Sequence, residues 1–401
     1  MNKPKTSREV DLTVDLCGLH FKNPFILSAG PPTARTDMIK RAFDAGWAGA
    51  VVKTFKPAPT PNVSPRFASI FSEEKKMMGF VNIELSNEYR LEDELPKIRS
   101  LKREYPDHVL LAGIMAGMKA SEWQEMARKL QDAGVDMLEM ALWCPGGKTG
   151  TIGEDPEAVR DVVEWVKEAV SIPVTVKLAP NVTDITLIAK AAERGGADAI
   201  SATDSVPCFM GVDLERMEPL TSVGGHSAFG GYSGPAIKPI VLRHVVQLAK
   251  STRLPISGIG GISSWRDAAE YLMVGASTLQ LCTAVMFEGY RIIDDLNEGL
   301  SNYLVRKGFK SASDLVGYVL PKIVDDVEKL DFSYKVLPRI DGSSCVKCGL
   351  CYLACRDGGY QAIELDKERF PKVDEEKCAG CSLCMQVCPV WGCIEMRSKQ
   401  R

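Results

Sequence analysis

The sequence has 401 residues, of which 45% are hydrophobic and 25% are charged, and its formal net charge at pH 7 is −3. Such a chain can form a large core and a second, smaller domain. This small negative charge gives no positive field that would attract nucleic acid. The longest apolar stretch, 109–118, is too short to cross a bilayer. Residues 1–10 are polar and mixed in charge, unlike a secretory signal. We expect a cytoplasmic protein that binds neither nucleic acid nor membrane.

Eight short apolar stretches recur along the first three quarters of the chain. They are apolar at nearly every position, which is typical of parallel strands that are covered on both faces. The predicted strands are residues 25–29, 49–54, 109–115, 137–142, 174–178, 199–203, 256–259 and 278–282.

Amphipathic helical patterns alternate with these strands. The clearest covers 156–170, where Asp155 occupies the N-cap position, Pro156 suits the first turn and five valines form one stripe. The other predicted helices cover residues 37–45, 121–133, 184–194, 238–250, 265–274 and 289–307.

The number and length of these units predict an α/β fold in which a (β/α)8 TIM barrel comes first. Eight strand–helix units over about 280 residues are typical of that barrel. A doubly wound open sheet is the alternative, but no G-x-G-x-x-G motif follows the first strand. We expect the barrel in residues 1–308, a connecting segment in 309–335 and a cysteine-rich domain in 336–401.

Two long inserts interrupt the barrel pattern, at 56–80 and at 205–235. Loops of this length inside a compact domain are usually functional. The second insert is rich in glycine and serine, and we expect it to cover the active face.

The last domain contains two cysteine runs of C-x2-C-x2-C-x3-C spacing, which is typical of a small α+β ferredoxin-like domain with two [4Fe–4S] clusters. In two-cluster ferredoxins the fourth cysteine of each run ligates the other cluster, and soft thiolates suit iron in this role. The first predicted ligand set is Cys345, Cys348, Cys351 and Cys388. The second predicted ligand set is Cys378, Cys381, Cys384 and Cys355.

Zinc and disulfides are the alternatives for these cysteines. Zinc accepts C-x2-C pairs but has no use for the third and fourth cysteine of each run. Disulfides are typical of small secreted chains, and no secretory segment is visible here. The spacing therefore favours a carrier of single electrons.

A flavin would convert single electrons into the pairs that most metabolites accept, and the barrel offers a place for its phosphate. The seventh strand runs into Gly260-Gly261 and the eighth into Cys282-Thr283, where barrels of this kind bind phosphate. Glycines allow backbone N–H groups to approach phosphate oxygens, although they also serve tight turns. Lys53 and Lys177 end apolar strands, where a buried lysine needs an anion unless it points into solvent at the rim.

Several stretches resemble the dihydroorotate and dihydropyrimidine dehydrogenases, and the double cluster narrows the resemblance to the dihydropyrimidine dehydrogenase family, in its bacterial catalytic-subunit form. The stretches are Asn23-Pro24-Phe25, Ala45-Gly46-Trp47, Val52-Lys53-Thr54-Phe55, Asn82-Ile83-Glu84-Leu85, Lys177-Leu178-Ala179-Pro180-Asn181-Val182-Thr183-Asp184, Gly231-Tyr232-Ser233-Gly234, Gly260-Gly261-Ile262 and Leu279-Gln280-Leu281-Cys282. The resemblance implies that FMN is lined by Ala29, Lys53, Thr54, Lys177, Gly234, Gly260, Gly261, Cys282 and Thr283.

The resemblance also implies the reaction, which is hydride transfer between flavin N5 and a C=C bond next to a carbonyl. An acid on a mobile loop after the fourth strand handles the proton, and Cys144 occupies that place, followed by Gly146 and Gly147. A thiol with a pKa of about 8.5 is protonated at neutral pH yet able to release the proton. A packed strand-end cysteine is the alternative.

The substrate pocket departs from the family's pattern. Asparagines that bind the pyrimidine ring in the family are replaced by Lys119, Ala141 and the pair Asp204-Ser205, and Trp143 replaces a small residue before the acid. Asparagine amides donate and accept hydrogen bonds, whereas these replacements do not repeat both roles. We therefore expect a pyrimidine or, more readily, another planar unsaturated lactam or carboxylate as substrate, bound by Lys119, Trp143, Asp204 and Ser205.

The chain lacks a dinucleotide motif, so the resemblance implies a separate electron donor. An NAD(P)H-oxidising flavoprotein subunit or a ferredoxin would serve, in a homodimer or a heterotetramer. The competing hypothesis is an electron-transfer module whose flavin relays charge without a substrate of its own.

Overall fold

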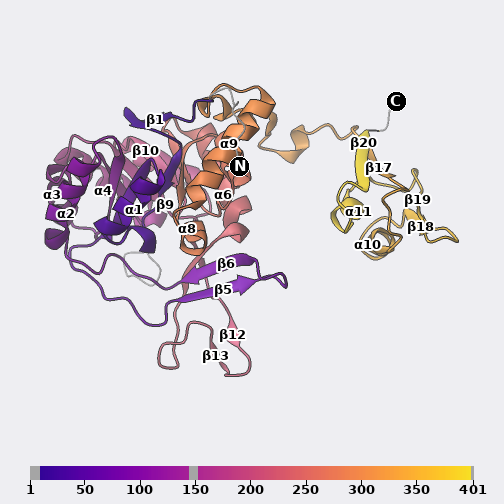
Figure 1. Cartoon of the computed structure of the whole chain (residues 1–401), viewed down its shortest axis with the longest axis horizontal. Coiled ribbons are helices and arrows are strands. Elements are labelled where there is room, and N and C mark those ends of the chain that lie inside the picture. Colours follow the sequence, from indigo (N-terminus) through magenta and orange to yellow (C-terminus); the bar gives the residue numbers. More distant parts are fainter. Residues whose placement is uncertain (1–9, 144–151, 399–401) are drawn as a thin grey trace, which may run out of the picture. The chain divides into compact units, whose positions relative to one another are not determined.

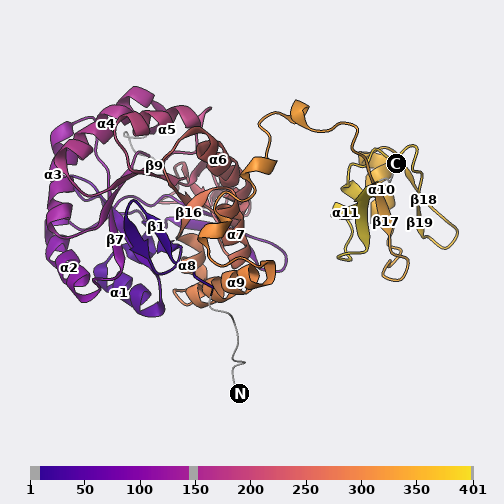
Figure 2. The same cartoon turned by 90° about the horizontal axis from the view of Figure 1, so that it is seen from above.

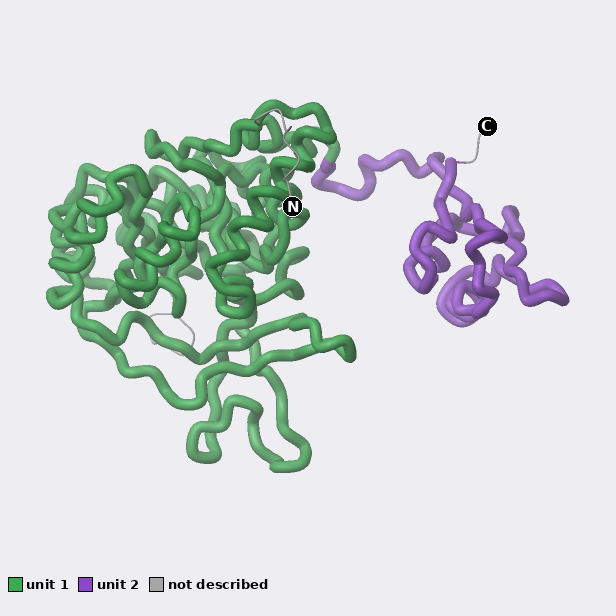
Figure 3. The backbone as a smooth tube through the Cα atoms, viewed as in Figure 1, with its two compact units in different colours: residues 1–322 green, residues 323–401 purple. Residues whose placement is uncertain are grey.

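The computed structural model describes residues 10–143 and 152–398. The chain separates into two compact units, residues 1–322 and 323–401, which Figure 3 shows in two colours. Each unit is described by itself below. The predicted domain limits, with the barrel ending at residue 308 and the cysteine-rich domain beginning at residue 336, remain predictions. Cys144 and its glycine-rich loop lie outside the described residues.

The first unit is built around a closed barrel of eight parallel strands, which confirms the predicted fold. The strands follow the barrel in the order β10-β15-β16-β3-β4-β7-β8-β9, and each predicted strand is one of them. They are β3 (Phe25–Leu27), β4 (Gly49–Phe55), β7 (Val109–Ile114), β8 (Met137–Ala141), β9 (Val174–Leu178), β10 (Ala199–Ala202), β15 (Ile256–Ile259) and β16 (Ala276–Leu281).

Helices surround the barrel as a ring, which is seen from above in Figure 2. They are α1 (Thr36–Ala45), α2 (Leu91–Glu104), α3 (Ala120–Asp132), α4 (Pro156–Ala169), α5 (Ile185–Arg194), α6 (Lys238–Ser251), α7 (Trp265–Met273), α8 (Thr283–Glu288) and α9 (Ile292–Lys307). The expected cap of α4 is present, because the Asp155 carboxylate accepts the backbone N–H of Glu157 at 2.9 Å.

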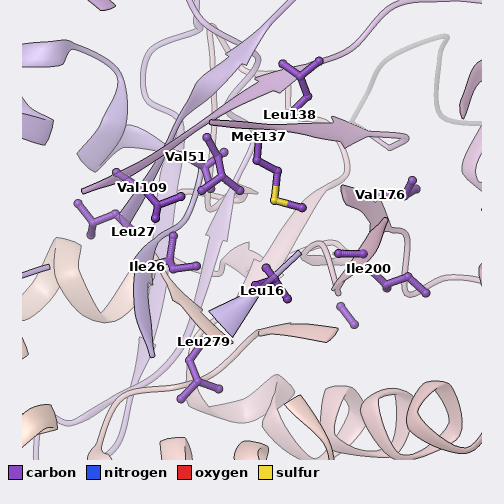
Figure 4. Close-up of a cluster of buried hydrophobic side chains, with 14 of the residues drawn as sticks. Leu16, Ile26, Leu27, Val51, Val109, Met137, Leu138, Val176, Ile200 and Leu279 are labelled. Atoms are coloured by element: carbon purple, nitrogen blue, oxygen red, sulfur yellow. The ribbon is translucent and has the colours of Figure 1, made fainter. Parts of the chain in front are cut away.

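The core lies both inside the barrel and between the strands and the helices. Figure 4 shows apolar side chains from several strands meeting, among them Val51, Leu138 and Ile200, all fully buried. A hairpin of β1 (Val14–Leu16) and β2 (Leu19–Phe21) precedes the barrel. Phe21 packs against the first residue of β4, which places the hairpin at the amino end of the strands. The opposite, carboxyl end therefore stays available for a site.

Both long inserts fold into one antiparallel sheet. It has the order β11-β14-β6-β5, with the strands β5 (Phe67–Phe71), β6 (Met77–Asn82), β11 (Val206–Cys208) and β14 (Gly230–Ser233). A small hairpin of β12 (Val212–Asp213) and β13 (Glu218–Pro219) extends from it (Figure 1). We call this four-stranded sheet the covering sheet, because its residues roof the cavity described below.

The second unit has two pairs of antiparallel strands and two short helices. These elements are β17 (Val336–Ile340), α10 (Leu350–Gly358), β18 (Ile363–Leu365), β19 (Pro371–Val373), α11 (Leu383–Gln386) and β20 (Ile394–Ser398). Its small core combines Ile363 and Ile394 with buried cysteines. Across all described residues of the chain, the helices are too short or too polar for a membrane-spanning segment.

Candidate active site and cysteine hollows

A cavity of about 1200 Å³, counting the space open to solvent, lies at the carboxyl ends of the barrel strands. We call it the barrel cavity. Its floor comes from residues at or just beyond the ends of β3, β4, β9, β10, β15 and β16. Phe80 and Asn82 of β6 and Ser233 of β14 also line it, so the covering sheet forms part of its wall. Enzymes with this barrel place their sites at the same end.

The barrel cavity brings together all nine residues predicted from the resemblance to contact FMN. They are Ala29, Lys53, Thr54, Lys177, Gly234, Gly260, Gly261, Cys282 and Thr283. Three of the predicted substrate residues, Trp143, Asp204 and Ser205, line the same cavity. Trp143 directly precedes the predicted acid Cys144, which itself lies outside the described residues.

Lys119 is the predicted substrate residue that the structure does not bring to the barrel cavity. It stands at the N-cap of α3, where its side chain is 66% exposed. Its ammonium nitrogen lies 3.0 Å from the carboxylate of Glu122, one turn into the same helix. In the free protein this lysine belongs to a solvated helix end rather than to the cavity lining.

Lys53 is paired within the protein, although the sequence predicted an external anion for it. Its ammonium group forms an ion pair with Glu84, and both side chains are 7% exposed. The second carboxylate oxygen of Glu84 lies 3.5 Å from Nε of Arg66 and has no hydrogen-bond partner among the described residues. The barrel cavity thus contains a buried carboxylate oxygen with unused capacity to accept a hydrogen bond.

Lys177 is likewise paired, with a carboxylate that follows β10. Its Nζ lies 3.5 Å from Oδ2 of Asp204. Burial alone would lower the pKa of Lys177, but the carboxylates of Asp204 and Glu139 raise it above its ordinary value. The lysine is therefore charged at neutral pH.

Glu139 lies inside the barrel as part of a buried polar network. Its Oε2 accepts hydrogen bonds from Oγ of Ser201 at 2.8 Å and from Nε2 of Gln280 at 2.8 Å. The Ser201 hydroxyl lies 3.2 Å from that of Thr175. Gln280 also lines the barrel cavity, so this network connects the barrel interior with the floor of the site.

Cys282 is packed closely against Gly30, in the loop that follows β3, the first strand of the barrel. A Cβ added to Gly30 would lie 2.6 Å from its sulfur, so a larger residue at position 30 would displace this thiol. Burial raises the pKa of Cys282 to about 12. The thiol is neutral at physiological pH and contributes no charge to the cavity.

Three glycines at the edge of the barrel cavity form what we call the glycine cradle. Nearby atoms leave little room for a side chain at these positions. Gly234, Gly260 and Gly261 all have positive φ, at 88°, 132° and 72°. A Cβ on Gly261 would lie 2.9 Å from the carbonyl oxygen of Gly234 and 2.9 Å from the backbone nitrogen of Lys238. Positive φ and close backbone approach are features of phosphate-binding turns.

Asp267 of α7 holds the loop that follows this cradle. Its Oδ2 accepts the N–H of Ser263 at 3.0 Å and the hydroxyl of Ser264 at 2.9 Å, and its Oδ1 lies 2.6 Å from Nζ of Lys238. Sequence inspection did not single out Asp267. The signal for it was the pair Ser263-Ser264 just before α7, followed by an acidic residue in the first turn of the helix.

Sequence reasoning also missed cavity residues at the end of β6 and just after it. Asn82, Glu84 and Ser86 all line the barrel cavity. Asn82 ends β6 of the covering sheet and the other two follow it, so the rule that sites lie after barrel strands does not find them. The signal was Lys53, because a buried lysine needs a carboxylate and Glu84 lies in the next stretch of the chain.

The second unit contains two hollows, each of about 350 Å³ including space open to solvent. The first cysteine hollow is lined by Cys345, Cys348, Cys351 and Cys388, and also by Cys393, which belongs to neither run. The second cysteine hollow is lined by Cys355, Cys378, Cys381 and Cys384. Each hollow thus contains one predicted ligand set, with the fourth cysteine of each run at the other run's hollow.

Among the described residues, neither hollow has the geometry of a closed site for a single ion. At a Zn–S distance of about 2.3 Å, four sulfurs around zinc would lie within about 4 Å of one another. In the part of the chain that the structure describes, no three His, Cys, Asp or Glu side chains converge closely enough to hold one ion. The same described residues contain only free cysteines, so disulfides do not join these sulfurs.

Comparison with known proteins assigns both units. A family model described as "Dihydroorotate dehydrogenase" matches residues 11–304. A second model, described as "4Fe-4S dicluster domain", matches residues 338–396. The two matches fall in the barrel unit and in the cysteine-rich unit.

Individual relatives agree with the family matches. The chain is 45% identical over 394 residues to the "NAD-dependent dihydropyrimidine dehydrogenase subunit PreA" of Escherichia coli, covering 96% of this chain and 95% of that protein. It is 34% identical over 330 residues to the chloroplastic "Dihydropyrimidine dehydrogenase (NADP(+))" of Arabidopsis thaliana, covering 78% of each. It is 37% identical over 316 residues to "Dihydroorotate dehydrogenase B (NAD(+)), catalytic subunit" of Pyrococcus horikoshii, covering 77% of this chain and 98% of that one.

These relatives are named as dehydrogenases, and the similarity covers 96% of this chain for the E. coli protein and 77–78% for the other two. The chain is therefore an oxidoreductase of the class that acts on CH–CH bonds. The resemblance noted in the sequence is confirmed: the chain belongs to the dihydroorotate dehydrogenase family and, with its added 4Fe-4S domain, to the dihydropyrimidine dehydrogenases within it.

Proposed function

We propose that this chain is an FMN- and iron–sulfur-dependent oxidoreductase that reduces, or forms, a C=C bond next to a carbonyl. The observation that carries the proposal is the barrel cavity, which gathers the nine predicted flavin residues and three predicted substrate residues at one end of the barrel. Bound FMN would supply hydride transfer at its N5 atom. The residues of the chain bind the cofactor, orient the substrate and handle the proton.

The glycine cradle is the proposed phosphate site. Gly234, Gly260 and Gly261 leave space at the ends of β14 and β15, and backbone N–H groups in positive-φ turns are suited to phosphate oxygens. Lys53 and Lys177 are the proposed cationic contacts of the flavin ring. Cys282 and Thr283 would contribute packing and a hydroxyl at the end of β16.

Cys144 is the proposed proton donor. Its neighbours Ala141 and Trp143 line the barrel cavity, so the segment that leads to Cys144 borders the proposed site. A neutral thiol gives its proton to the substrate carbon in reduction, and the thiolate takes it back in the reverse direction. Apolar Trp143 would keep water from that side of the substrate.

The predicted substrate is planar and offers an N–H group. Asp204 and Glu84 are acceptors, and Ser205 donates or accepts. Lys119 lies outside the cavity lining, so the structure adds no support for a carboxylate substrate, and we favour an unsaturated lactam or amide. Assays with uracil and thymine test the altered pocket. Turnover at an ordinary rate would restore a plain pyrimidine substrate.

The cysteine-rich unit is the proposed entry for electrons, through two [4Fe–4S] clusters. The predicted set of four cysteines at each hollow meets the ligand requirement of one cubane cluster. A separate NAD(P)H-oxidising flavoprotein subunit or a ferredoxin would reduce these clusters. The E. coli and P. horikoshii relatives are named as subunits, which supports an assembly such as a heterotetramer, or a homodimer, in the cytoplasm.

The alternative function is an electron relay that lacks its own substrate. Replacing Cys144 by Ala distinguishes the two. An enzyme would lose substrate reduction by about 10²-fold or more while its flavin is still reduced at the normal rate. A relay would keep full electron transfer to an artificial acceptor and would show no substrate turnover in either form. A screen of planar lactams and amides by flavin absorbance identifies the substrate for this comparison.

A further inference from the structure

The charges around the barrel cavity form two groups, one at each predicted flavin lysine. Lys53 pairs with Glu84, whose other oxygen faces Arg66. Lys177 faces two carboxylates, Asp204 at 3.5 Å and Glu139 from inside the barrel. Among the described residues, the three cations and three anions of this set balance.

Asp204 is held in its position by its neighbour. Its Oδ1 accepts the backbone N–H of Ser205 at 2.7 Å, and the Ser205 hydroxyl lies 3.3 Å from the same oxygen. Its own backbone N–H donates to the carbonyl oxygen of Leu178 at 2.9 Å, which ties the loop after β10 to the end of β9. With Oδ1 engaged, Oδ2 is the oxygen that faces Lys177.

A carboxylate at this distance changes what Lys177 does for an acceptor of electrons. A flavin gains negative charge on reduction, and an isolated ammonium group beside it would stabilise the reduced form. The side chains of Lys177 and Asp204 are only 9% and 19% exposed, so the Coulomb interaction between them is screened less than in water. A carboxylate 3.5 Å from the ammonium group therefore cancels much of its field. An uncharged side chain at position 204 would leave the field intact.

We propose that Asp204, as a positioning residue for Lys177, lowers the reduction potential of the flavin and so biases the enzyme toward reduction of its substrate. This inference rests on the proposed binding of FMN in the barrel cavity. A lower potential makes the reduced flavin a stronger donor to a C=C bond. It also requires a more strongly reducing supply of electrons.

The test is the midpoint potential of the flavin in the whole holoprotein, measured by anaerobic spectroelectrochemistry at flavin wavelengths. The variant is Asp204→Asn, which keeps the side chain's size and removes its charge. The control is Glu122→Gln, the same change of acid to amide at a residue that pairs with Lys119 outside the cavity lining.

The expected result is a higher potential in Asp204→Asn, with at least a tenfold larger ratio of reduced to oxidised flavin at a given potential. For a two-electron couple this is about 30 mV. Glu122→Gln should match the wild type. An unchanged or lower potential in Asp204→Asn would overturn the inference.

Two further outcomes are distinguishable. If Asp204→Asn fails to fold or to retain flavin, Asp204→Ser removes the same charge with a smaller side chain, and its potential decides the question by the same criterion. Wild-type protein without flavin absorbance would overturn the proposed function itself, together with this inference. A flavin that is present but insensitive to Asp204 overturns the inference alone.

Discussion

At the scale of single residues, the barrel cavity contains buried charges that the sequence did not reveal. The pair of Lys53 and Glu84 is almost fully buried. Removing one member of such a pair leaves the other charge desolvated and uncompensated, which is far more costly than losing a surface pair. The pair therefore gives the wall between β4 and the covering sheet one stable arrangement.

Replacing Glu84 by Ala should lower the free energy of unfolding of the barrel unit by about 3–5 kcal/mol, because Lys53 would lose its buried partner. Denaturant unfolding followed by tryptophan fluorescence measures this loss. The matched control is Glu122→Ala, which breaks the exposed pair with Lys119 and should change stability by less than about 1 kcal/mol. Equal effects of the two variants would contradict the account.

Asp267 should make stability depend on pH in a defined direction. Burial would raise the pKa of Asp267, but Lys238 and the hydrogen bonds from Ser263 and Ser264 outweigh it and hold the pKa below its usual value. Because the native pKa is depressed, the stabilisation is present above the unfolded pKa of about 3.9 and is lost as pH falls through the native pKa.

Asp267→Asn should therefore be less stable than the wild type at pH 7, by about 1.5–3 kcal/mol for hydrogen bonds to a charged group. The difference should shrink as the pH falls below about 4. Urea midpoints of both proteins at pH 7 and pH 3 measure it. A gap that stays constant over this range would show that the charge of Asp267 does not stabilise the fold.

At the scale of elements, the strands were easier to predict than the helices and the inserts. Most positions of the barrel strands are apolar, because helices cover one face and barrel residues the other. Helix α2 was missed, since Pro96 and several acidic residues obscure its apolar stripe of Leu91, Leu95 and Ile98. The pairing of β6 with β14 joins inserts about 150 residues apart, and no local pattern specifies such contacts.

In the candidate site, too, some residues could be predicted from the sequence and others could not. The residues that follow barrel strands meet in the cavity because the barrel closes. Lys119 follows β7 but turns outward, because it caps α3 and pairs with Glu122. Asn82 lines the cavity from the end of β6 and Glu84 from the loop just after it. A rule based on barrel strands cannot place either residue.

The glycine cradle permits a test of the predicted phosphate site. Gly261→Ala places a methyl group 2.9 Å from two backbone atoms, which cannot move independently of the loop. Gly18→Ala is the control, because Gly18 also has positive φ, at 79°, but no atom lies within 4 Å of its added Cβ. In both variants the alanine must adopt a left-handed backbone conformation, which costs about 1–2 kcal/mol.

The expected result is that Gly261→Ala loses most of its FMN while Gly18→Ala retains it. Flavin absorbance per mole of purified protein, with far-UV circular dichroism to verify folding, measures the difference. Full flavin content in folded Gly261→Ala would remove this cradle as the phosphate site.

At the scale of the whole molecule, the proposed function assigns pairs of electrons to the barrel unit and single electrons to the cysteine-rich unit. Among the described residues, the barrel unit supplies the barrel cavity, and the cysteine-rich unit supplies two hollows, each of which is lined by one predicted set of four cysteines. The exchange of the fourth cysteine between the runs ties both halves of the small unit to both hollows. Cluster assembly and folding of that unit are therefore expected to depend on each other.

The central claim is that the cysteine hollows hold two clusters that supply a flavin in the barrel cavity. Iron, acid-labile sulfide and flavin, all determined in protein purified without oxygen, test it most directly. The account predicts about eight iron atoms and eight sulfides per chain, as two cubane clusters require, together with one FMN. Colourless protein, or zinc in place of iron at these cysteines, would contradict it.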